Sequence, residues 1–135
     1  MQIQIADYLR ACLPPPPEGP WWTHPHNEGQ RSGIDAVRAQ QMGQRAGTPD
    51  LLMVWRCGVI AIELKAGRTG TSAGQDATHA DLRACGAAVH VCRSLDDVVA
   101  VLDGHGVPLR GRPAPLHGDA MAWPAAPADR EQGDR

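Results

Sequence analysis

The residues best suited to chemistry in this sequence surround Lys65, the only lysine in a chain of 135 residues. Glu63 stands two residues before Lys65 in an apolar segment, and Asp50 precedes that glutamate by thirteen residues. Because alternate residues of a strand face the same side, Glu63 and Lys65 would project together from one face. Two charges on such a face are costly unless they meet a partner. A divalent cation next to a phosphodiester would supply that partner.

Metal-assisted cleavage of a phosphodiester requires oxygen ligands for a hard cation, a positioned water and positive charge near the phosphorus. Asp50 and Glu63 offer carboxylates, and the backbone carbonyl of Leu64 lies directly after Glu63. Lys65 can orient the water or contact the phosphate. A simpler interpretation stays open, in which Asp50 is a turn residue and the other two charges form an ion pair worth about 0–1 kcal/mol.

The segment that carries these residues predicts a β-hairpin, with strands at 51–55 and 59–65. If the loop consists of two residues at 57–58, Asp50 stands opposite Lys65. Directly opposed residues share a face, and so do residues two apart on one strand. Asp50, Glu63 and Lys65 would then converge on one side of the hairpin, whereas a three-residue loop would change the register.

The rest of the chain up to residue 110 predicts an α/β domain in which helices and strands alternate. Helices are expected at about 3–13, 31–42, 72–85 and 94–104, and further strands at 21–24 and 87–92. Ser72 and Gln75 fit a capping box at the start of the third helix. Residues 111–135 are rich in Pro, Ala, Gly and charge, which predicts a disordered tail.

Composition places the chain in a reducing, aqueous compartment. The four cysteines form neither a CxxC pair nor a disulfide framework, and no histidine or cysteine spacing matches a zinc finger. No signal peptide and no membrane-length apolar segment is visible, so we expect a cytoplasmic protein. The net charge is −2, but residues 31–68 carry a local excess of three positive charges.

Several short motifs follow one another along the chain. They are His24-Pro25-His26-Asn27-Glu28-Gly29, Gly47-Thr48-Pro49-Asp50-Leu51-Leu52, Ile62-Glu63-Leu64-Lys65, Gln75 ahead of Leu82 and Gly86, and Ser94-Leu95-Asp96-Asp97-Val98. At Asp50 and 63–65 the chain resembles the PD-(D/E)XK nucleases. The whole series, over about residues 2–110, resembles the VRR-NUC family, the virus-type replication-repair nuclease domain, in its small stand-alone phage-like form.

The resemblance implies a restriction-endonuclease-like core, with a mixed β-sheet flanked by helices, and an active site that depends on Mg²⁺ or Mn²⁺. Matched position by position, Asp50, Glu63 and the Leu64 carbonyl become metal ligands, Lys65 the catalytic lysine, and Gln75 a catalytic residue on the next helix. The implied activity is that of a DNA endonuclease in replication, repair or recombination. Branched or flapped DNA, a homodimer, and a phage- or prophage-encoded protein in a bacterial cytoplasm are further implications.

Candidate DNA contacts are Asn27, in the polar turn after the first strand, together with Arg31, Arg38, Arg45 and Arg68. The first three arginines recur every seven residues, which on one helix gives a basic face for phosphate contacts. An ordinary solvated face is the alternative.

The chain departs from the family pattern in its first helix. The family usually has an acidic residue there, ahead of a glutamine that Gln4 would match, but the acid would fall before Met1. Asp7 is the only acid in that helix. This departure motivates the alternative function, a catalytically weak nucleic-acid-binding module with a degenerate nuclease site.

Four side chains near the motifs have two interpretations each. Gln75 is either only a capping residue or also part of the site, and His79, one helical turn later, either borders the site or is an ordinary histidine at the edge of the core. Trp21 and Trp22 can stack on bases, although core packing is the favoured interpretation for both.

Overall fold

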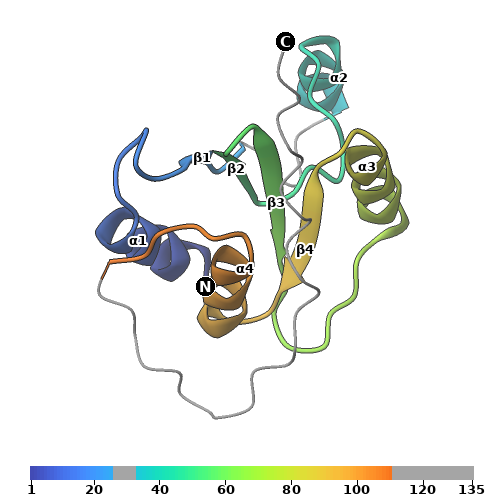
Figure 1. The fold of residues 1–135 in the computed structure, drawn as a ribbon. Coiled ribbons are helices and arrows are strands. Elements are labelled where there is room, and N and C mark those ends of the chain that lie inside the picture. The colour runs from blue at the N-terminus through green and yellow to red at the C-terminus, as the bar shows by residue number, and fades with distance from the viewer. Residues whose placement is uncertain (26–32, 111–135) are drawn as a thin grey trace, which may run out of the picture.

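The computed structural model describes residues 1–25 and 33–110, and in these ranges four helices surround a four-stranded mixed sheet (Figure 1). The helices are α1 (Gln2–Cys12), α2 (Gly33–Gln41), α3 (Ala73–Ala84) and α4 (Leu95–Gly104). The strands are β1 (Trp21–Thr23), β2 (Leu51–Trp55), β3 (Gly58–Leu64) and β4 (Ala88–Cys92). The predicted α/β fold, with a mixed sheet flanked by helices, is confirmed. The expected turn at 27–29 and the expected tail at 111–135 lie outside the described residues.

The order of the sheet follows the order of the chain, β1-β2-β3-β4. The first two pairs are antiparallel and the pair β3–β4 is parallel. A parallel pair needs a long crossover connection, and α3 lies within it. This crossover carries α3 back over the sheet, where its first turn reaches the residues at the end of β3.

The hairpin between β2 and β3 turns one residue earlier than the sequence suggested. Trp55 pairs with Gly58, so the loop is Arg56-Cys57 rather than 57–58. Both loop residues have positive φ, 47° and 62°. Two-residue hairpin loops with two positive φ angles match the twist of the flanking strands.

The prediction that Asp50 stands opposite Lys65 is therefore wrong. Leu51 pairs with Ile62, and continuing this antiparallel pairing by one residue places Asp50 opposite Glu63. The register differs from the expected one by two residues, and a shift of two keeps every side chain on its predicted face. Asp50, Glu63 and Lys65 still share one side of the sheet.

The two faces of β3 have different surroundings. Ile60 and Ile62 face α1 and α4 and belong to the main apolar core, whose fully buried members also include Ile5, Leu9, Met53, Val98, Val101 and Leu102. Each such side chain stabilises the fold by about 1.5–3 kcal/mol relative to exposure. Glu63, on the opposite face, points toward α3. Because its side chains alternate between the two faces, β3 separates the apolar core on one face from the polar residues beneath α3 on the other.

The predicted helix starts at Ser72 and Ser94 are confirmed, each with a complete capping box, to Gln75 and Asp97 respectively. Trp22 packs against the core as expected, but the expectation is wrong for Trp21, which is 56% exposed. A short edge strand buries only alternate side chains, so neighbouring tryptophans cannot both enter the core.

The second helix ends within one residue of the expected position and stands away from the sheet (Figure 1). It ends at Gln41, and Gly43 continues the chain with a φ of 88° that takes it out of the helix. Arg45 therefore lies beyond the helix, and the predicted basic face of three arginines on one helix is wrong for this residue. Arg38 is an exposed residue of α2, and Arg31 lies outside the described residues.

Candidate active site

Asp50 lies immediately before β2, where three contacts fix it. Its Oδ2 accepts a hydrogen bond from the backbone amide of Leu64 at 2.8 Å, and its Oδ1 accepts one from Gln2 Nε2 at 2.8 Å. Its backbone carbonyl contacts Nδ1 of His24. The aspartate thus replaces a rung of the β2–β3 ladder and links α1, β1 and β3.

The loop that leads into Asp50 packs closely against the start of α3. A Cβ at Gly47 would stand 2.5 Å from the carbonyl oxygen of Gly74 and 2.8 Å from the amide nitrogen of Gln75, and the φ of Gly47 is 75°. Only glycine fits this combination of close approach and backbone angle. Thr78 Oγ1 adds a hydrogen bond to the carbonyl of Ala46 at 2.7 Å. These contacts set the position of α3 relative to the aspartate loop.

Glu63, Lys65 and Gln75 form a connected polar group at the end of β3. Gln75 Nε2 donates to Glu63 Oε1 at 2.6 Å, and Lys65 Nζ donates to Gln75 Oε1 at 2.7 Å. Lys65 Nζ also lies 3.3 Å from Glu63 Oε1. An ammonium has three donors, so these two interactions leave one N–H for another partner.

Gln75 belongs both to the helix cap and to the polar group. Its Oε1 accepts from the backbone amide of Ser72 at 2.9 Å while it also accepts from Lys65. The two interpretations of Gln75 are therefore compatible, because an amide carbonyl has two lone pairs and its nitrogen has two N–H donors. The cap fixes the orientation of the amide that contacts Glu63 and Lys65.

Glu63 is only 3% exposed, and its environment favours the protonated form. Burial raises the pKa of this carboxyl above its usual value, the negative charge of Asp50 raises it further, and Lys65 and Gln75 oppose both effects. The influence of Asp50 means that the two carboxylates repel one another across the β2–β3 register. A positive charge between them would relieve that repulsion.

His79 faces Glu63 from the second turn of α3. It is 2% exposed, and its Nε2 lies 3.9 Å from Glu63 Oε2. Within residues 1–25 and 33–110, neither of these two atoms has a hydrogen-bond partner. Burial lowers the pKa of His79, which favours the neutral ring. His79 therefore borders the site.

The second oxygen of Glu63 is the atom best placed to bind something else. Buried polar atoms almost always have a partner, so an unpaired carboxylate oxygen indicates a ligand position. The Leu64 amide points toward Asp50, and the carbonyl of the same residue faces the same side of the strand. Among residues 1–25 and 33–110, no three His, Cys, Asp or Glu side chains group as metal ligands. A cation here would thus be held by two carboxylates, this carbonyl, and water or substrate oxygens, a donor set typical of Mg²⁺.

Gln2, rather than Gln4, is the glutamine of the first helix that reaches the site. Both glutamines are exposed, but Gln2 stands three residues before Ile5 and so lies in line with the buried stripe of Ile5, Leu9 and Cys12. A polar residue in line with an apolar helical stripe was the sequence signal for this contact.

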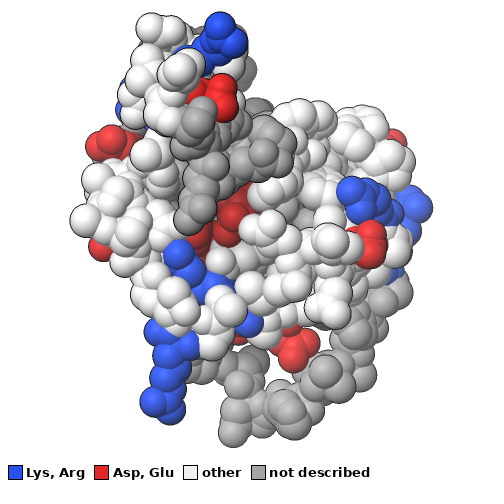
Figure 2. Space-filling model, turned by 180° about the vertical axis from the view of Figure 1, so that it is seen from behind, with Lys and Arg blue, Asp and Glu red and all other residues white. Residues whose placement is uncertain are grey.

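The described candidate DNA contacts lie on three separate segments of the chain. Arg38, Arg45 and Arg68 are exposed, on α2 and in two separate loops, and Asn27 and Arg31 lie outside the described residues. In Figure 2, acidic atoms are visible in a recess near the middle of the face, and Lys and Arg atoms are spread around it. Their part in binding DNA stays a prediction. Within the described ranges, no helix combines the length and apolar character needed to cross a membrane.

Comparison with known proteins adds a single observation. No protein-family model matches the chain, and no curated protein matches it. A search of solved structures finds similarity to a "VRR_NUC domain protein", with a TM-score of 0.47 and 27% sequence identity. The similarity covers 55% of this chain and 63% of that one, so the chain spans less than two thirds of the protein that it matches.

Proposed function

We propose that this chain is a nuclease that hydrolyses phosphodiester bonds in DNA and uses Mg²⁺ or Mn²⁺. One observation carries the proposal: Asp50, just before β2, and Glu63, at the end of β3, are close enough for the charge of Asp50 to raise the pKa of Glu63, and Glu63 stands next to a lysine that is held by Gln75. Repelling carboxylates, an unpaired buried oxygen and an oriented ammonium together fit a cation and a phosphate.

The cation would be held by Asp50, Glu63 and the Leu64 carbonyl. When bound there, it would neutralise charge on the phosphate and lower the pKa of an attacking water. Asp50 can bind the cation and still accept its hydrogen bonds from the Leu64 amide and Gln2, because each carboxylate oxygen has a second lone pair. These two hydrogen bonds would keep the carboxylate in its present orientation. Binding of a cation would remove the repulsion that now raises the pKa of Glu63.

Lys65 and Gln75 would position the reacting groups. Gln75 holds Lys65 Nζ at 2.7 Å, and the remaining N–H of that ammonium can bind the attacking water or a phosphate oxygen. A prepositioned positive charge stabilises the charge that develops on the phosphate without further reorganisation.

A purely structural ion-pair network explains the group less well. Such a network would give both oxygens of the buried carboxylate a partner, because a buried carboxylate is costly to leave partly unpaired. Among the described residues Glu63 Oε2 has no such partner, and Asp50 and Glu63 bring two negative charges together against a single lysine.

Cleavage of plasmid, branched and flapped DNA with Mg²⁺ or Mn²⁺ tests the proposal. We expect metal-dependent cleavage that is lost in Asp50→Ala and Lys65→Ala. Asp81→Asn is the matched control, since Asp81 is an exposed acid on α3 away from the polar group. Cleavage that survives in both site variants would exclude this mechanism, and activity without metal would exclude the role of the cation.

A second copy of the chain is part of the proposal, because one site cuts one strand. Ile34 and Val37, three residues apart on α2, are 78% and 54% exposed and offer an apolar surface for it. Light scattering of the purified protein should give twice the chain mass, and Ile34→Glu should halve that value.

The alternative is a weak DNA-binding module with a degenerate site. In its favour, Asp7, the only acid of α1, pairs with Arg10 on the exposed side, and an uncharged glutamine, Gln2, contacts Asp50. This alternative predicts DNA binding that persists in EDTA, a steep salt dependence and no cleavage stimulated by metal.

A further inference from the structure

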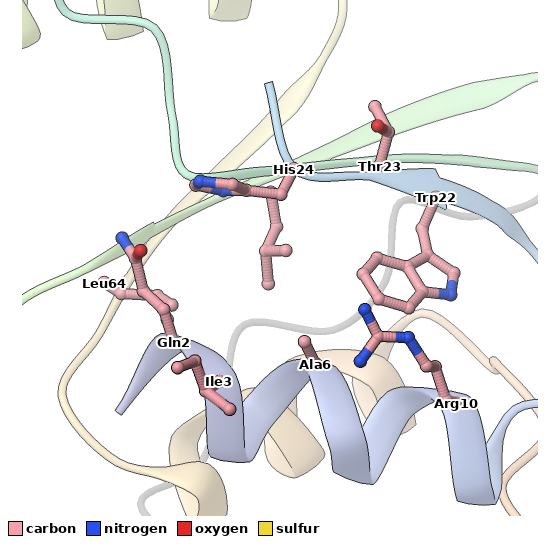
Figure 3. Close-up of a pocket in the computed structure, with 9 residues that line it drawn as sticks. Gln2, Ile3, Ala6, Arg10, Trp22, Thr23, His24 and Leu64 are labelled. Atoms are coloured by element: carbon pink, nitrogen blue, oxygen red, sulfur yellow. The ribbon is translucent and has the colours of Figure 1, made fainter. Parts of the chain in front are cut away.

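A pocket of about 450 Å³ lies directly beside Asp50, between α1 and the edge of the sheet at β1 and β2 (Figure 3). Its floor is apolar and includes Ala6 and Leu51. Pockets of this size and character commonly hold small molecules or cofactors. Nothing in the metal-binding arrangement of Asp50 and Glu63 requires such a pocket.

One end of the pocket is lined by residues that contact Asp50. Gln2 and His24 line this end, and both contact Asp50, the first through its carboxylate and the second through its backbone carbonyl. Leu64, whose amide binds the same carboxylate, also lines the pocket. A ligand in the pocket would therefore be a direct neighbour of any group bound at Asp50.

The other end carries an aromatic ring and a positive charge. The guanidinium carbon of Arg10 stands 6.0 Å from the centroid of the Trp22 ring, and Figure 3 shows the two side chains facing one another across the pocket. This separation is at the outer limit for a cation–π attraction. It is also close to twice the stacking distance of about 3.4 Å, which is the separation that two flat groups need when a third ring stacks between them. A small outward movement of the exposed Arg10 would admit one flat ring between them.

The helix sets the distance between the two ends. Gln2 and Arg10 are eight residues apart on α1, which corresponds to about 12 Å along the helix axis. That length exceeds one base step of stacked DNA, about 3.4 Å per strand. The next base of a stacked strand therefore falls short of Trp22, and only a nucleotide extended out of the stack would reach it.

We propose that this pocket receives the base of one unpaired DNA nucleotide next to the phosphate bound at Asp50, with the base stacked on Trp22 and a flanking phosphate held by Arg10. The inference rests on the proposed nuclease function and adds a substrate class to it. A paired base is stacked inside a duplex and would have to be extruded at a cost, whereas an unpaired base enters freely. The pocket thus favours single strands, flaps and gaps over intact duplex.

Binding in EDTA tests the pocket without relying on cleavage. The probes are a fluorescein-labelled oligothymidylate, the same length of duplex, and a single strand with abasic sugars at its central positions, measured by fluorescence anisotropy. We expect the oligothymidylate to bind at least tenfold more tightly than the abasic strand. Arg10→Gln and Trp22→Leu should each weaken binding of the oligothymidylate roughly tenfold, the scale of base–aromatic stacking.

Two further variants separate recognition from folding. Trp22→Phe keeps a ring for stacking and should restore most of the affinity lost in Trp22→Leu. Arg56→Gln is the matched control, because Arg56 stands 5.2 Å from the Trp55 ring at the hairpin tip and does not line the pocket. Thermal melting should show all variants folded, and Arg10 is exposed enough that its replacement should not perturb the core.

Failure of the pocket and failure of the nuclease function give different results. If the wild-type protein cleaves DNA but Arg10→Gln and Trp22→Leu bind every probe as the control does, the pocket proposal is overturned. Equal affinity for abasic and base-containing strands would also overturn it. If no DNA is cleaved with either metal but the base-dependent binding remains, the pocket stands and the catalytic proposal fails.

Discussion

Gln75 Nε2 donates a hydrogen bond of 2.6 Å to Glu63 Oε1 and so connects the first turn of α3 to the end of β3. The same side chain closes the capping box of its helix with Ser72. Formation of the helix and orientation of the buried carboxylate are thereby coupled through one amide. Local structure and site geometry can be separated only by variants that remove one of the two contacts.

Ser72→Ala should remove the cap and leave the contacts of Gln75 with Glu63 and Lys65. We expect a loss of about 1 kcal/mol in the free energy of unfolding, as for other N-cap replacements, and little change in cleavage. Gln75→Ala should show a comparable loss of stability and at least tenfold slower cleavage. Ser94→Ala, at the other capping box, controls for stability alone. Equal rates for Ser72→Ala and Gln75→Ala would argue against a site role for Gln75.

Lys65→Arg keeps the positive charge but replaces a compact ammonium with a broad planar group. The ammonium lies between Glu63 and Gln75, so we expect the fold and Mn²⁺ affinity to be largely retained while cleavage falls about a hundredfold, as when one transition-state donor is lost. Calorimetric titration with Mn²⁺ and cleavage rates measure the two effects. Arg56→Lys, at the exposed hairpin tip, should change neither, and a fully active Lys65→Arg would contradict a water-orienting role.

Glu63 should make the metal-free protein less stable as the pH rises. Its pKa is raised in the folded state, mainly by burial, so the folded protein binds this proton more tightly than the unfolded chain does. The contribution of Glu63 to the free energy of unfolding is most favourable at a pH below 4.5, its ordinary pKa. That contribution is lost as the pH rises through the pKa of the folded state. Glu63→Gln should remove this dependence and be more stable than the wild type in alkaline buffer without metal.

Addition of Mg²⁺ or Mn²⁺ supplies the control for that effect. A ligand that binds only the folded state raises stability by an amount set by its concentration over its dissociation constant. Melting temperatures in alkaline buffer should therefore rise with metal in the wild type and not in Glu63→Gln. A metal-induced rise of the same size in both proteins would place the cation elsewhere.

Gly47→Ala should be one of the most damaging single changes in the chain. The new Cβ would meet the carbonyl of Gly74 at 2.5 Å, and the positive φ of 75° adds strain. Gly43→Ala has a similar φ, 88°, but open space around the Cβ, so it should cost about 1–2 kcal/mol from strain alone. We expect Gly47→Ala to exceed that loss in denaturant unfolding and also to slow cleavage. Equal stability of the two variants would mean that the loop does not pack against α3 as described.

His90 should destabilise the fold in acid. Burial and the neighbouring His105, whose Nε2 lies 2.9 Å from that of His90, lower the pKa of His90 from 6.5 to about 4. The unfolded chain therefore binds the proton first as the pH falls, and stability should decrease between pH 6.5 and about 4. The full effect would be roughly 3 kcal/mol at 1.36 kcal/mol for each pKa unit. Denaturant unfolding of the wild type and His90→Phe over this range measures it, and parallel pH profiles would contradict it.

The sequence by itself determined the elements and the faces of the site. The apolar alternation around Glu63 predicted β3, Gly58 and its neighbours predicted the hairpin, and Ser72 with Gln75 predicted the start of α3. These predictions succeeded because strand period, turn chemistry and capping depend on residues close together in the chain. Even the wrong register left Asp50 on the correct face, since it differed by an even number of residues.

Only the tertiary structure decided which distant residues meet. Gln2 reaches Asp50 because α1 packs across the sheet, and His79 faces Glu63 because the β3–β4 crossover carries α3 over the polar face. The pocket between α1 and β1 likewise joins residues that no local pattern relates. Such contacts depend on the packing of whole helices against the sheet, which local propensities do not specify.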